Sequence, residues 1–347
     1  MKAALYTQFK GQISVENVPD PTPSADSVVL KVEATGLCRS DWHGWMGHDS
    51  DIDLPHVPGH ELAGTIVELG KEVSGFQIGD RVTVPFVGGC GHCAHCETGN
   101  QQVCDNQFQP GFTHWGSFAE YVEIKYAQLN LVKLPDPIAF DTAASLGCRF
   151  ITSYRAVVHQ GRVRPEQWVA VYGCGGVGLS AIMISKAFGA HVIGIDINQE
   201  ALSLAKTSGA DFVINSSLEN PVEAIREITK GGAHLSLDAL GNKTTCYQSI
   251  QSLRKRGKHI QVGLMAGDDF DPAIPMHLVV ANELEILGSH GMQAHAYPEM
   301  LKLIETGKLK PQLMIKDRIT LSESVERLPR MNEFQQSGIT IINSLHN

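Results

Sequence analysis

The pattern of hydrophobic and polar positions changes near residue 168. Before residue 150, short β-branched runs separated by Gly, Pro and Asp predict a distorted antiparallel or barrel-like domain. These runs are Val28–Ala34, Leu62–Leu69 and Arg81–Phe86. From Trp168 onward, apolar runs alternate with helical stretches, which indicates βαβ units and a parallel sheet. The change marks a domain boundary.

The second region predicts a series of six strands, a number that suits a doubly wound dinucleotide-binding fold. They are Trp168–Tyr172, His191–Asp196, Phe212–Asn215, His234–Ala239, Lys258–Gly263 and Leu284–Gly288. Between two of them, Asn220 and Pro221 predict a helix start, Glu223 supports its first turn, and Gly231-Gly232 end it. The mixed character after Gly288 indicates a return to the first domain. We expect a catalytic domain over 1–150, completed by 289–347, and a nucleotide-binding domain over 151–288.

Composition narrows the class of ligand. Hydrophobic residues make up 43% of the chain and charged residues 19%, a mixture typical of globular proteins. The net charge is -9 and no basic stripe is present, which argues against nucleic acid or an anionic membrane as a partner. Small molecules are the expected ligands.

The N-terminal sequence runs from Met1 directly into a strand-like segment and lacks the features of a signal peptide, so we expect a cytoplasmic protein. The most apolar stretch, Trp168–Ala190, contains a Gly-rich turn and is interrupted by Lys186. It is better explained as a buried strand, turn and helix than as a membrane span. In a reducing compartment, the 8 cysteines are more readily metal ligands than disulfide partners.

A glycine-rich turn follows the first strand of the second region. Its residues are Gly173-Cys174-Gly175-Gly176-Val177-Gly178. In the pattern G-x-G-x-x-G, the first Gly makes the tight turn, the second lets the backbone approach a pyrophosphate, and the third allows close helix packing. Asp196 ends the next strand, 18 residues past Gly178. A carboxylate at this position can accept hydrogen bonds from the ribose hydroxyls of NAD and repel the 2′-phosphate of NADP. The alternative is a structural turn without a ligand.

Four cysteines with gaps of two, two and seven residues predict a closed tetrahedral zinc site; they are Cys90, Cys93, Cys96 and Cys104. An iron–sulfur cluster is the rival, but ferredoxin-type runs place the fourth Cys after three residues and before Pro. Here it precedes Asp105. We expect His92 and His95 in this loop to be bystanders.

Three further residues are scattered along the chain: Cys38, His60 and Cys148. Taken singly, each is ordinary, because a lone Cys is usually a buried apolar residue and a lone His a satisfied core residue. Together they supply two thiolates and an imidazole, a ligand set of catalytic zinc that leaves a fourth position open.

On these residues the chain resembles the zinc-dependent alcohol dehydrogenases of the medium-chain dehydrogenase/reductase family. The likeness covers nearly the whole chain, and its most specific elements are Gly59-His60-Glu61-Leu62-Ala63-Gly64, the four-Cys loop and the Gly-rich turn. The resemblance implies an α/β protein with a β-rich GroES-like catalytic domain and a doubly wound Rossmann domain. It also implies NAD and two zinc ions per subunit, one catalytic and one structural, in a homotetramer or homodimer.

The resemblance also implies individual roles. Cys38, His60 and Cys148 would hold the catalytic zinc, with Asp41 as a partner of His60 and Glu61 as a carboxylate behind the metal. Ser40 would pass the alcohol proton, by way of the ribose hydroxyls, to His43. The remaining implied contacts are with the coenzyme: Thr152 and Val177 with the nicotinamide, and Arg39 with the pyrophosphate.

The sequence departs from the family at one position: many relatives carry Gly-Arg near the C-terminus, whereas this chain reads Gly338-Ile339. Several aromatic residues flank the metal motifs and predict an apolar substrate pocket. They are Trp42, Trp45, Phe86, His114 and Trp115; core packing explains any one of them equally well.

The sequence leaves three alternative functions. A more specialised alcohol or a polyol is an alternative substrate within the family. A zinc-free quinone or enoyl reductase on the same fold needs none of the seven ligand positions, so their joint presence argues against that function. A structural or storage protein on a dehydrogenase scaffold, as among lens crystallins, has little reason to keep Ser40 and His43 beside the ligand set.

Overall fold

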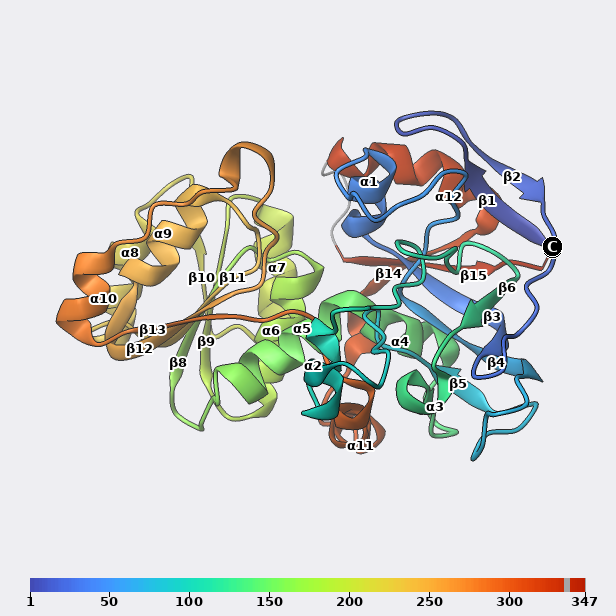
Figure 1. The fold of residues 1–347 in the computed structure, drawn as a ribbon. Coiled ribbons are helices and arrows are strands. Elements are labelled where there is room, and N and C mark those ends of the chain that lie inside the picture. Colours follow the sequence, from blue (N-terminus) through green and yellow to red (C-terminus); the bar gives the residue numbers. More distant parts are fainter. Residues whose placement is uncertain (334–337, 347) are drawn as a thin grey trace. The chain divides into compact units, whose positions relative to one another are not determined.

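The computed structural model describes residues 1–333 and 338–346. The chain forms two compact units (Figure 1). The first comprises Met1–Ile151, Gly291–Gly307 and Ile315–Asn347, and the second comprises Thr152–His290 and Lys308–Met314. The sequence had placed all of 289–347 with the first unit. The short segment Lys308–Met314 belongs to the second because Met314 packs there, its sulfur accepting a hydrogen bond from the Ser180 hydroxyl at 3.7 Å.

The first unit is β-rich. Within the described residues its larger sheet has the order β14-β15-β3-β4-β5-β7, with β6 beside β3, and β1 pairs with β2 in a small antiparallel sheet. The strands are β1 (Lys2–Tyr6), β2 (Ile13–Asn17), β3 (Val28–Leu37), β4 (Leu62–Leu69), β5 (Arg81–Thr83), β6 (Tyr121–Ile124), β7 (Val132–Lys133), β14 (Ile315–Thr320) and β15 (Ile339–Ser344). The helices are α1 (Arg39–Trp45), α2 (Ala94–Glu97), α3 (Ala127–Asn130), α4 (Phe140–Ser145), α11 (Tyr297–Glu305) and α12 (Leu321–Arg327).

The second unit holds a parallel sheet of six described strands in the order β10-β9-β8-β11-β12-β13. The strands are β8 (Trp168–Tyr172), β9 (His191–Asp196), β10 (Phe212–Asn215), β11 (Ala233–Asp238), β12 (Leu253–Gln261) and β13 (Glu285–Gly288). The helices are α5 (Ile151–Tyr154), which begins at the boundary, α6 (Gly176–Ala187), α7 (Gln199–Thr207), α8 (Pro221–Thr229), α9 (Lys243–Gln251) and α10 (Met276–Asn282). This arrangement confirms the predicted fold class: a β-rich unit and a doubly wound unit.

Helices cover both faces of the parallel sheet, with α6 and α7 on one face and α8 and α9 on the other (Figure 1). Buried on both faces, β8 reads as a continuous apolar run, and its residues from Val169 to Tyr172 are fully buried. The strand order reverses at β8, so the carboxyl ends of β8 and β9 lie at the switch point where such sheets bind ligands.

Local signals account for several element boundaries. The predicted helix start holds, since the Asn220 side chain accepts from the Val222 N–H at 3.0 Å and Pro221 is the first helical residue. β5 ends at Thr83 rather than at the predicted Phe86; Pro85 in this stretch has no N–H to donate to a strand partner. β12 begins earlier than predicted, at Leu253. None of the described helices combines the length and apolar character needed to cross a bilayer.

Candidate active site and metal centres

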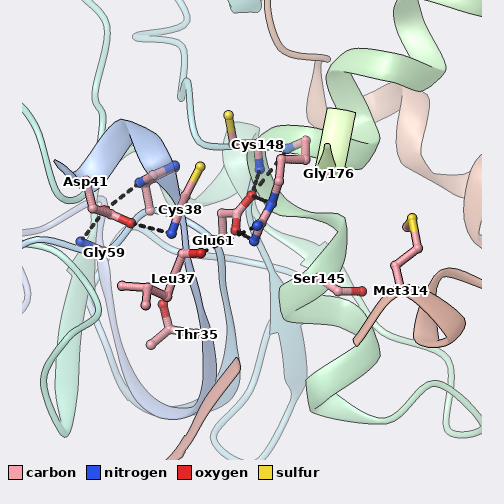
Figure 2. Close-up of polar contacts among 12 residues, drawn as sticks. Thr35, Leu37, Cys38, Asp41, Gly59, Glu61, Ser145, Cys148, Gly176 and Met314 are labelled. Atoms are coloured by element: carbon pink, nitrogen blue, oxygen red, sulfur yellow. Dashed lines mark hydrogen bonds and ion pairs between the residues drawn. The ribbon is translucent and has the colours of Figure 1, made fainter. Parts of the chain in front are cut away.

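Four side chains from three separate segments of the first unit converge on one point. Their potential ligand atoms all lie within 4.8 Å of one another, and the residues are Cys38, His60, Glu61 and Cys148. Three of them are the scattered ligand set that the sequence analysis grouped, and the fourth is the carboxylate expected behind the metal. Figure 2 shows Cys38, Glu61 and Cys148 facing this region.

Asp41 connects the segments that carry Cys38 and His60. Cys38 is the N-cap of α1 in an extended conformation, and Asp41 is the third helical residue. Its buried carboxylate accepts from the Cys38 N–H at 2.9 Å and from the Gly59 N–H at 3.0 Å (Figure 2). This is the reciprocal capping pattern expected when an acid follows an N-cap by three residues. Asp41 therefore holds the backbone at Cys38 and the backbone just before His60.

His60 is fully buried, yet only one of its ring nitrogens is partnered. Asp41 Oδ1 lies 2.8 Å from Nδ1, while Nε2 has no hydrogen-bond partner among the described residues. Burial lowers the pKa of His60, but the Asp41 carboxylate outweighs it and raises this pKa well above its ordinary value. A buried polar atom without a partner is costly. A metal ion at Nε2 would satisfy it, and the carboxylate on Nδ1 is the usual orienting partner of a metal-bound histidine.

Cys148 lies in a π-helical segment, Leu146–Phe150, that follows α4. Gly147 breaks the helical geometry there, with φ -17° and ψ -119°. Such segments recur at functional sites because they redirect a side chain. Here Cys148 faces Cys38. A hydrogen bond between the two thiols lowers the pKa of Cys38 well below its ordinary value and raises that of Cys148.

Arg149 was not assigned a role in the sequence analysis, although it follows a proposed ligand. Its guanidinium is buried against the Glu61 carboxylate in an ion pair. Burial raises the pKa of Glu61 to about 7, and the Arg149 charge opposes that rise. A lone Arg within the apolar run Leu146–Ile151 was the available signal, because a charged side chain in such a run needs a buried partner.

The four-Cys loop forms a second cluster in the first unit. The thiol sulfurs of Cys90, Cys93, Cys96 and Cys104 lie within 4.8 Å of one another. Cys104 Sγ accepts from the N–H groups of Cys90 and Asn106, both at 3.3 Å. Hydrogen bonds from the backbone at Cys96 and Asp105 lower the pKa of Cys93 to about 6, whereas burial raises that of Cys104 to about 12. Four sulfurs in a closed group with N–H donors fit a tetrahedral structural zinc.

The two histidines of this loop lie outside the thiol group. His92 Nδ1 is 2.8 Å from the Cys90 carbonyl, and the exposed His95 lies 3.7 Å from Asp105. Both positions agree with the expectation that these residues are bystanders.

In the second unit the Gly-rich turn joins β8 to α6. Gly173 has φ 90°, which favours glycine. A Cβ on Gly178 would lie 1.8 Å from the Gly173 carbonyl oxygen, whereas a Cβ on Gly175 would meet nothing within 4 Å. The first and third glycines therefore serve the turn and the packing, and the second leaves open space above the backbone. Gly176 and Val177 begin α6.

Asp196 ends β9 beside this turn. Its Oδ2 accepts from the Cys174 N–H at 2.7 Å and its Oδ1 from the Asn198 N–H at 2.9 Å. Each carboxylate oxygen can accept a second hydrogen bond. The acid is thus held in place by the glycine-rich turn and keeps acceptor capacity for a ligand.

The remaining predicted residues lie in two groups. Ser40 and His43 are one turn apart on α1, and His43 Nδ1 lies 2.9 Å from His48 Nδ1. Arg39 begins α1 and donates to the Asn332 side chain at 3.0 Å. In the second unit, Thr152 is buried, and the Val177 carbonyl accepts from the Ser153 hydroxyl at 2.8 Å.

The aromatic residues nominated for a substrate pocket have different surroundings. The Phe86 ring lies 6.1 Å from the His60 ring, and Phe112, which the sequence analysis missed, lies closer at 5.0 Å. Three others make local contacts: Trp45 donates to the Gly11 carbonyl, Trp115 to the Pro55 carbonyl, and His114 packs on Phe108. Trp42 lies against His43. No sequence signal distinguished Phe112, because only the fold brings it to His60.

At Gly338-Ile339, where the sequence departs from the family, the chain enters strand β15. Gly338 has φ 89° and Ile339 begins β15, fully buried and paired with Ile315.

Comparison with known proteins places both units in one family. Residues 24–136 match the alcohol dehydrogenase GroES-like domain, and residues 176–306 match the zinc-binding dehydrogenase domain. The chain is 36% identical to the NAD-dependent alcohol dehydrogenase of Sulfurisphaera tokodaii, over 99% of both chains. It is 35% identical to an alcohol dehydrogenase of Geobacillus stearothermophilus, over 95% of this chain and 96% of that one. The solved alcohol dehydrogenase of a Thermus species superposes with a TM-score of 0.90 at 27% identity, covering 99% of this chain and all of the other.

Proposed function

Because this chain belongs to the zinc-dependent alcohol dehydrogenases of the medium-chain dehydrogenase/reductase family, we propose that it transfers hydride between a primary or secondary alcohol, or its aldehyde or ketone, and NAD. The first unit is the proposed catalytic domain and the second the proposed NAD-binding domain. Seven side chains are the proposed zinc ligands: Cys38, His60 and Cys148 at the catalytic site, and Cys90, Cys93, Cys96 and Cys104 at the structural site.

The observation that carries the proposal is the state of His60. Its buried Nε2 has no partner among the described residues, while Asp41 holds Nδ1 at 2.8 Å. Two thiols complete the group around it. Such a set has no purpose in a zinc-free reductase on the same fold, and it offers an ion three donors of the right kind.

When bound, zinc supplies a Lewis acid that polarises the alcohol or carbonyl oxygen. The residues of the chain do the remaining work. Asp41 keeps Nδ1 of His60 engaged, so that Nε2 is the free donor. Phe86 and Phe112 beside the imidazole exclude water, which strengthens the electrostatic interactions of the site.

NAD, held by the second unit, would supply the hydride acceptor for oxidation and, in its reduced form, the hydride donor for reduction. Gly175 leaves room for the pyrophosphate, and the N-terminus of α6 presents its free N–H groups to that anion. Asp196 is the proposed acceptor for the adenosine ribose hydroxyls. Thr152 and Val177 are proposed to contact the nicotinamide and Arg39 the pyrophosphate, on the resemblance alone.

Alcohol oxidation also releases a proton, and we assign its path to Ser40 and His43. Ser40 accepts it from the alcohol, and His43 delivers it to solvent. Burial lowers the pKa of His43, and the nearby Arg39 and His48 lower it further. The imidazole is therefore neutral near pH 7 and able to accept a proton.

An NAD-reduction assay over short, branched and benzylic alcohols tests the proposal, with a polyol as the competing substrate class. The protein is assayed as purified, after a chelator has removed zinc, and after zinc or magnesium is restored. We expect activity that is lost on chelation and regained with zinc but not magnesium. Full activity in zinc-free protein, or iron with acid-labile sulfide in metal analysis, contradicts the proposal.

We further propose a homodimer or homotetramer in the cytoplasm. Two features of the second unit support assembly: β13 ends the strand order of its sheet, and large apolar side chains nearby are exposed, including Leu264, Phe270 and Val280. The reducing cytoplasm suits a protein in which six thiols must stay reduced so that they can bind metal. Cell fractionation with marker enzymes tests the location; recovery outside the cytosolic fraction contradicts it.

A further inference from the structure

The side chain that directly follows Cys148 is a buried arginine. Arg149 is 8% exposed, within a segment whose neighbours Leu146, Phe150 and Ile151 are fully buried apolar residues. A guanidinium is rarely buried unless a carboxylate pairs with it, because removing its charge from water is costly. Core packing alone would be served better by an apolar residue of similar volume.

The contacts of Arg149 lead to all three ligand segments. Its Nε donates to Glu61 Oε1 at 3.0 Å and its Nη2 donates to Glu61 Oε2, a bidentate arrangement. Its Nη1 reaches the Leu37 carbonyl at 3.4 Å. Leu37 precedes Cys38, Glu61 follows His60, and Arg149 itself follows Cys148.

Glu61 strengthens the same connection from the other side. Its Oε1 also accepts from the backbone N–H groups of Cys148, at 3.0 Å, and Arg149, at 3.3 Å (Figure 2). The carboxylate is fully buried, and its two oxygens are engaged by the segment that carries Cys148. The ion pair thus joins the strand end before Cys38, the loop of His60 and the π-helical segment.

Two glycines leave the space that this pair fills. A Cβ on Gly36 would lie 2.3 Å from Glu61 Oε2, and a Cβ on Gly147 would lie 2.4 Å from Glu61 Cβ. Any larger residue at either position would push the carboxylate away from the guanidinium. The close fit leaves the pair little room to move.

Arg149 also balances charge. The thiol of Cys38 and the carboxylates of Asp41 and Glu61 are buried in this part of the first unit, and the thiol of Cys148 is partly buried. The guanidinium of Arg149, which stays protonated in proteins, offsets part of this negative charge through its ion pair with Glu61.

We infer that Arg149 is a positioning residue of the catalytic metal site: through its bidentate pair with Glu61 it sets the mutual placement of Cys38, His60 and Cys148. The inference rests on the proposed zinc site. It predicts that loss of the guanidinium loosens the ligand set, even though Arg149 donates no atom to the metal.

Arg149→Met and Arg149→Lys test the inference. Arg318→Met is the matched control, because Arg318 also pairs with a carboxylate of the first unit, Asp141, at 2.6 Å, and has no part in the site. Two readouts are independent of turnover: the rate at which a chromogenic chelator removes zinc, and the absorption spectrum of cobalt bound to the site.

For Arg149→Met we expect retention of the catalytic-site ion to fall about 10–100-fold, with a changed cobalt spectrum, while the four-Cys site keeps its ion. Lysine keeps the charge but cannot form the bidentate pair, so Arg149→Lys should recover part of the retention. Arg318→Met should behave as the wild type. Wild-type retention and an unchanged spectrum in Arg149→Met would overturn the inference.

A double variant, Glu61→Gln with Arg149→Met, covers the case in which the single variant fails to fold because Glu61 is left buried and unpaired. If Arg149 acts through Glu61, the double variant retains the ion no worse than the more strongly affected of the two single variants, Glu61→Gln and Arg149→Met. Losses that simply add would overturn the inference. A wild type that takes up no metal at this site contradicts the proposed zinc site itself, so the two failures are distinguishable.

Discussion

His43 is half-buried on α1, between the buried Trp42 and the exposed His48. Its ring lies 5.0 Å from the Trp42 ring, and its Nδ1 is 2.9 Å from that of the exposed His48. Burial, then Arg39 and His48, lower its pKa below the ordinary value for histidine. The neutral form therefore persists to lower pH than in a free histidine, and protonation would disable the proposed relay only below that lowered pKa.

His43→Ala should slow alcohol oxidation by roughly 100–10,000-fold near neutral pH, the range that a single proton-transfer group contributes. At high pH the deficit should shrink, because hydroxide can take the proton directly. The pH profile of kcat/KM checks this, with His191→Ala, at the other end of β9 from the Gly-rich turn, as the control. A deficit that is the same at every pH would show that His43 does not carry the proton.

Asp196 is the proposed determinant of the choice of coenzyme. Charge-assisted hydrogen bonds to ribose hydroxyls contribute roughly 1.5–3 kcal/mol each, so NAD should be preferred over NADP by at least one to two orders of magnitude in kcat/KM. The next residues, from Ile197 to Ala201, include no Lys or Arg to pair with a 2′-phosphate, and Glu200 adds repulsion.

Asp196→Ala should weaken NAD use and relax the discrimination without creating an efficient NADP enzyme. Asp196→Asn separates the two effects, since the amide can still hydrogen-bond but has no charge to repel a phosphate. Steady-state kinetics with both coenzymes measures them. Equal efficiency with NAD and NADP in the wild type would remove Asp196 from the site.

At the scale of an element, the junction of β8 and α6 depends on glycine for two separate reasons. Gly178 allows α6 to pack on the turn, whereas Gly175 leaves free space on its outer side. A methyl group at each position therefore tests packing in one case and ligand access in the other.

Gly178→Ala should lower the free energy of unfolding by about 1–3 kcal/mol, because its Cβ would meet the Gly173 carbonyl at 1.8 Å. Gly175→Ala should change stability by less than about 0.5 kcal/mol but weaken NAD binding. Denaturant unfolding and calorimetric titration of NAD measure the two effects. A destabilised Gly175→Ala with normal NAD affinity would contradict the assignment.

The two proposed zinc sites, which lie in different segments of the first unit, are expected to have different roles. Cys148→Ala should abolish turnover and leave the fold intact, because the catalytic ion has an open position. Cys93→Ala should lower the melting temperature by roughly 3 °C or more, the shift that follows from about 2 kcal/mol in a chain of 347 residues. Cys246→Ala, a buried thiol outside both groups, is the control for cavity formation. Equal losses of activity and stability in both variants would argue against separate roles.

At the scale of the whole molecule, the exposed apolar surface lies mainly on the second unit. Val280 on α10 is 77% exposed and Phe270 is 71% exposed. Their segment lies between β12 and β13, the last strand in the order of the parallel sheet. A surface of this kind next to a sheet edge favours association with a second copy.

Val280→Asp should reduce the molecular mass in solution toward that of a monomer, because the charge would be buried in the interface. Ile78→Asp is the matched control: Ile78 is 65% exposed in the first unit. Light scattering coupled to size-exclusion chromatography measures both. A Val280→Asp protein of unchanged mass would place the interface elsewhere.

The sites that could be predicted from the sequence are those whose residues are close along the chain. The Gly-rich turn spans six consecutive positions, and the four thiols lie between Cys90 and Cys104. Short-range geometry alone restricts what such segments can form, because each glycine or Cys-x-x-Cys turn has few allowed conformations. The start of the helix after Asn220 and the alternation of six strands with helices could also be predicted, because each depends on a local pattern of residues.

Contacts across long separations were decided by the tertiary structure. Glu61 and Arg149 are 88 residues apart, and Asp41 and His60 are 19 apart. The family resemblance anticipated the second pair but not the first, nor the ring of Phe112 against His60. These meetings depend on the β3 and β4 register, on a π-helical turn at Cys148 and on glycines that admit the Glu61 carboxylate. A linear pattern cannot specify them, because burial and pairing of a charged side chain are properties of the packed core rather than of its neighbours along the chain.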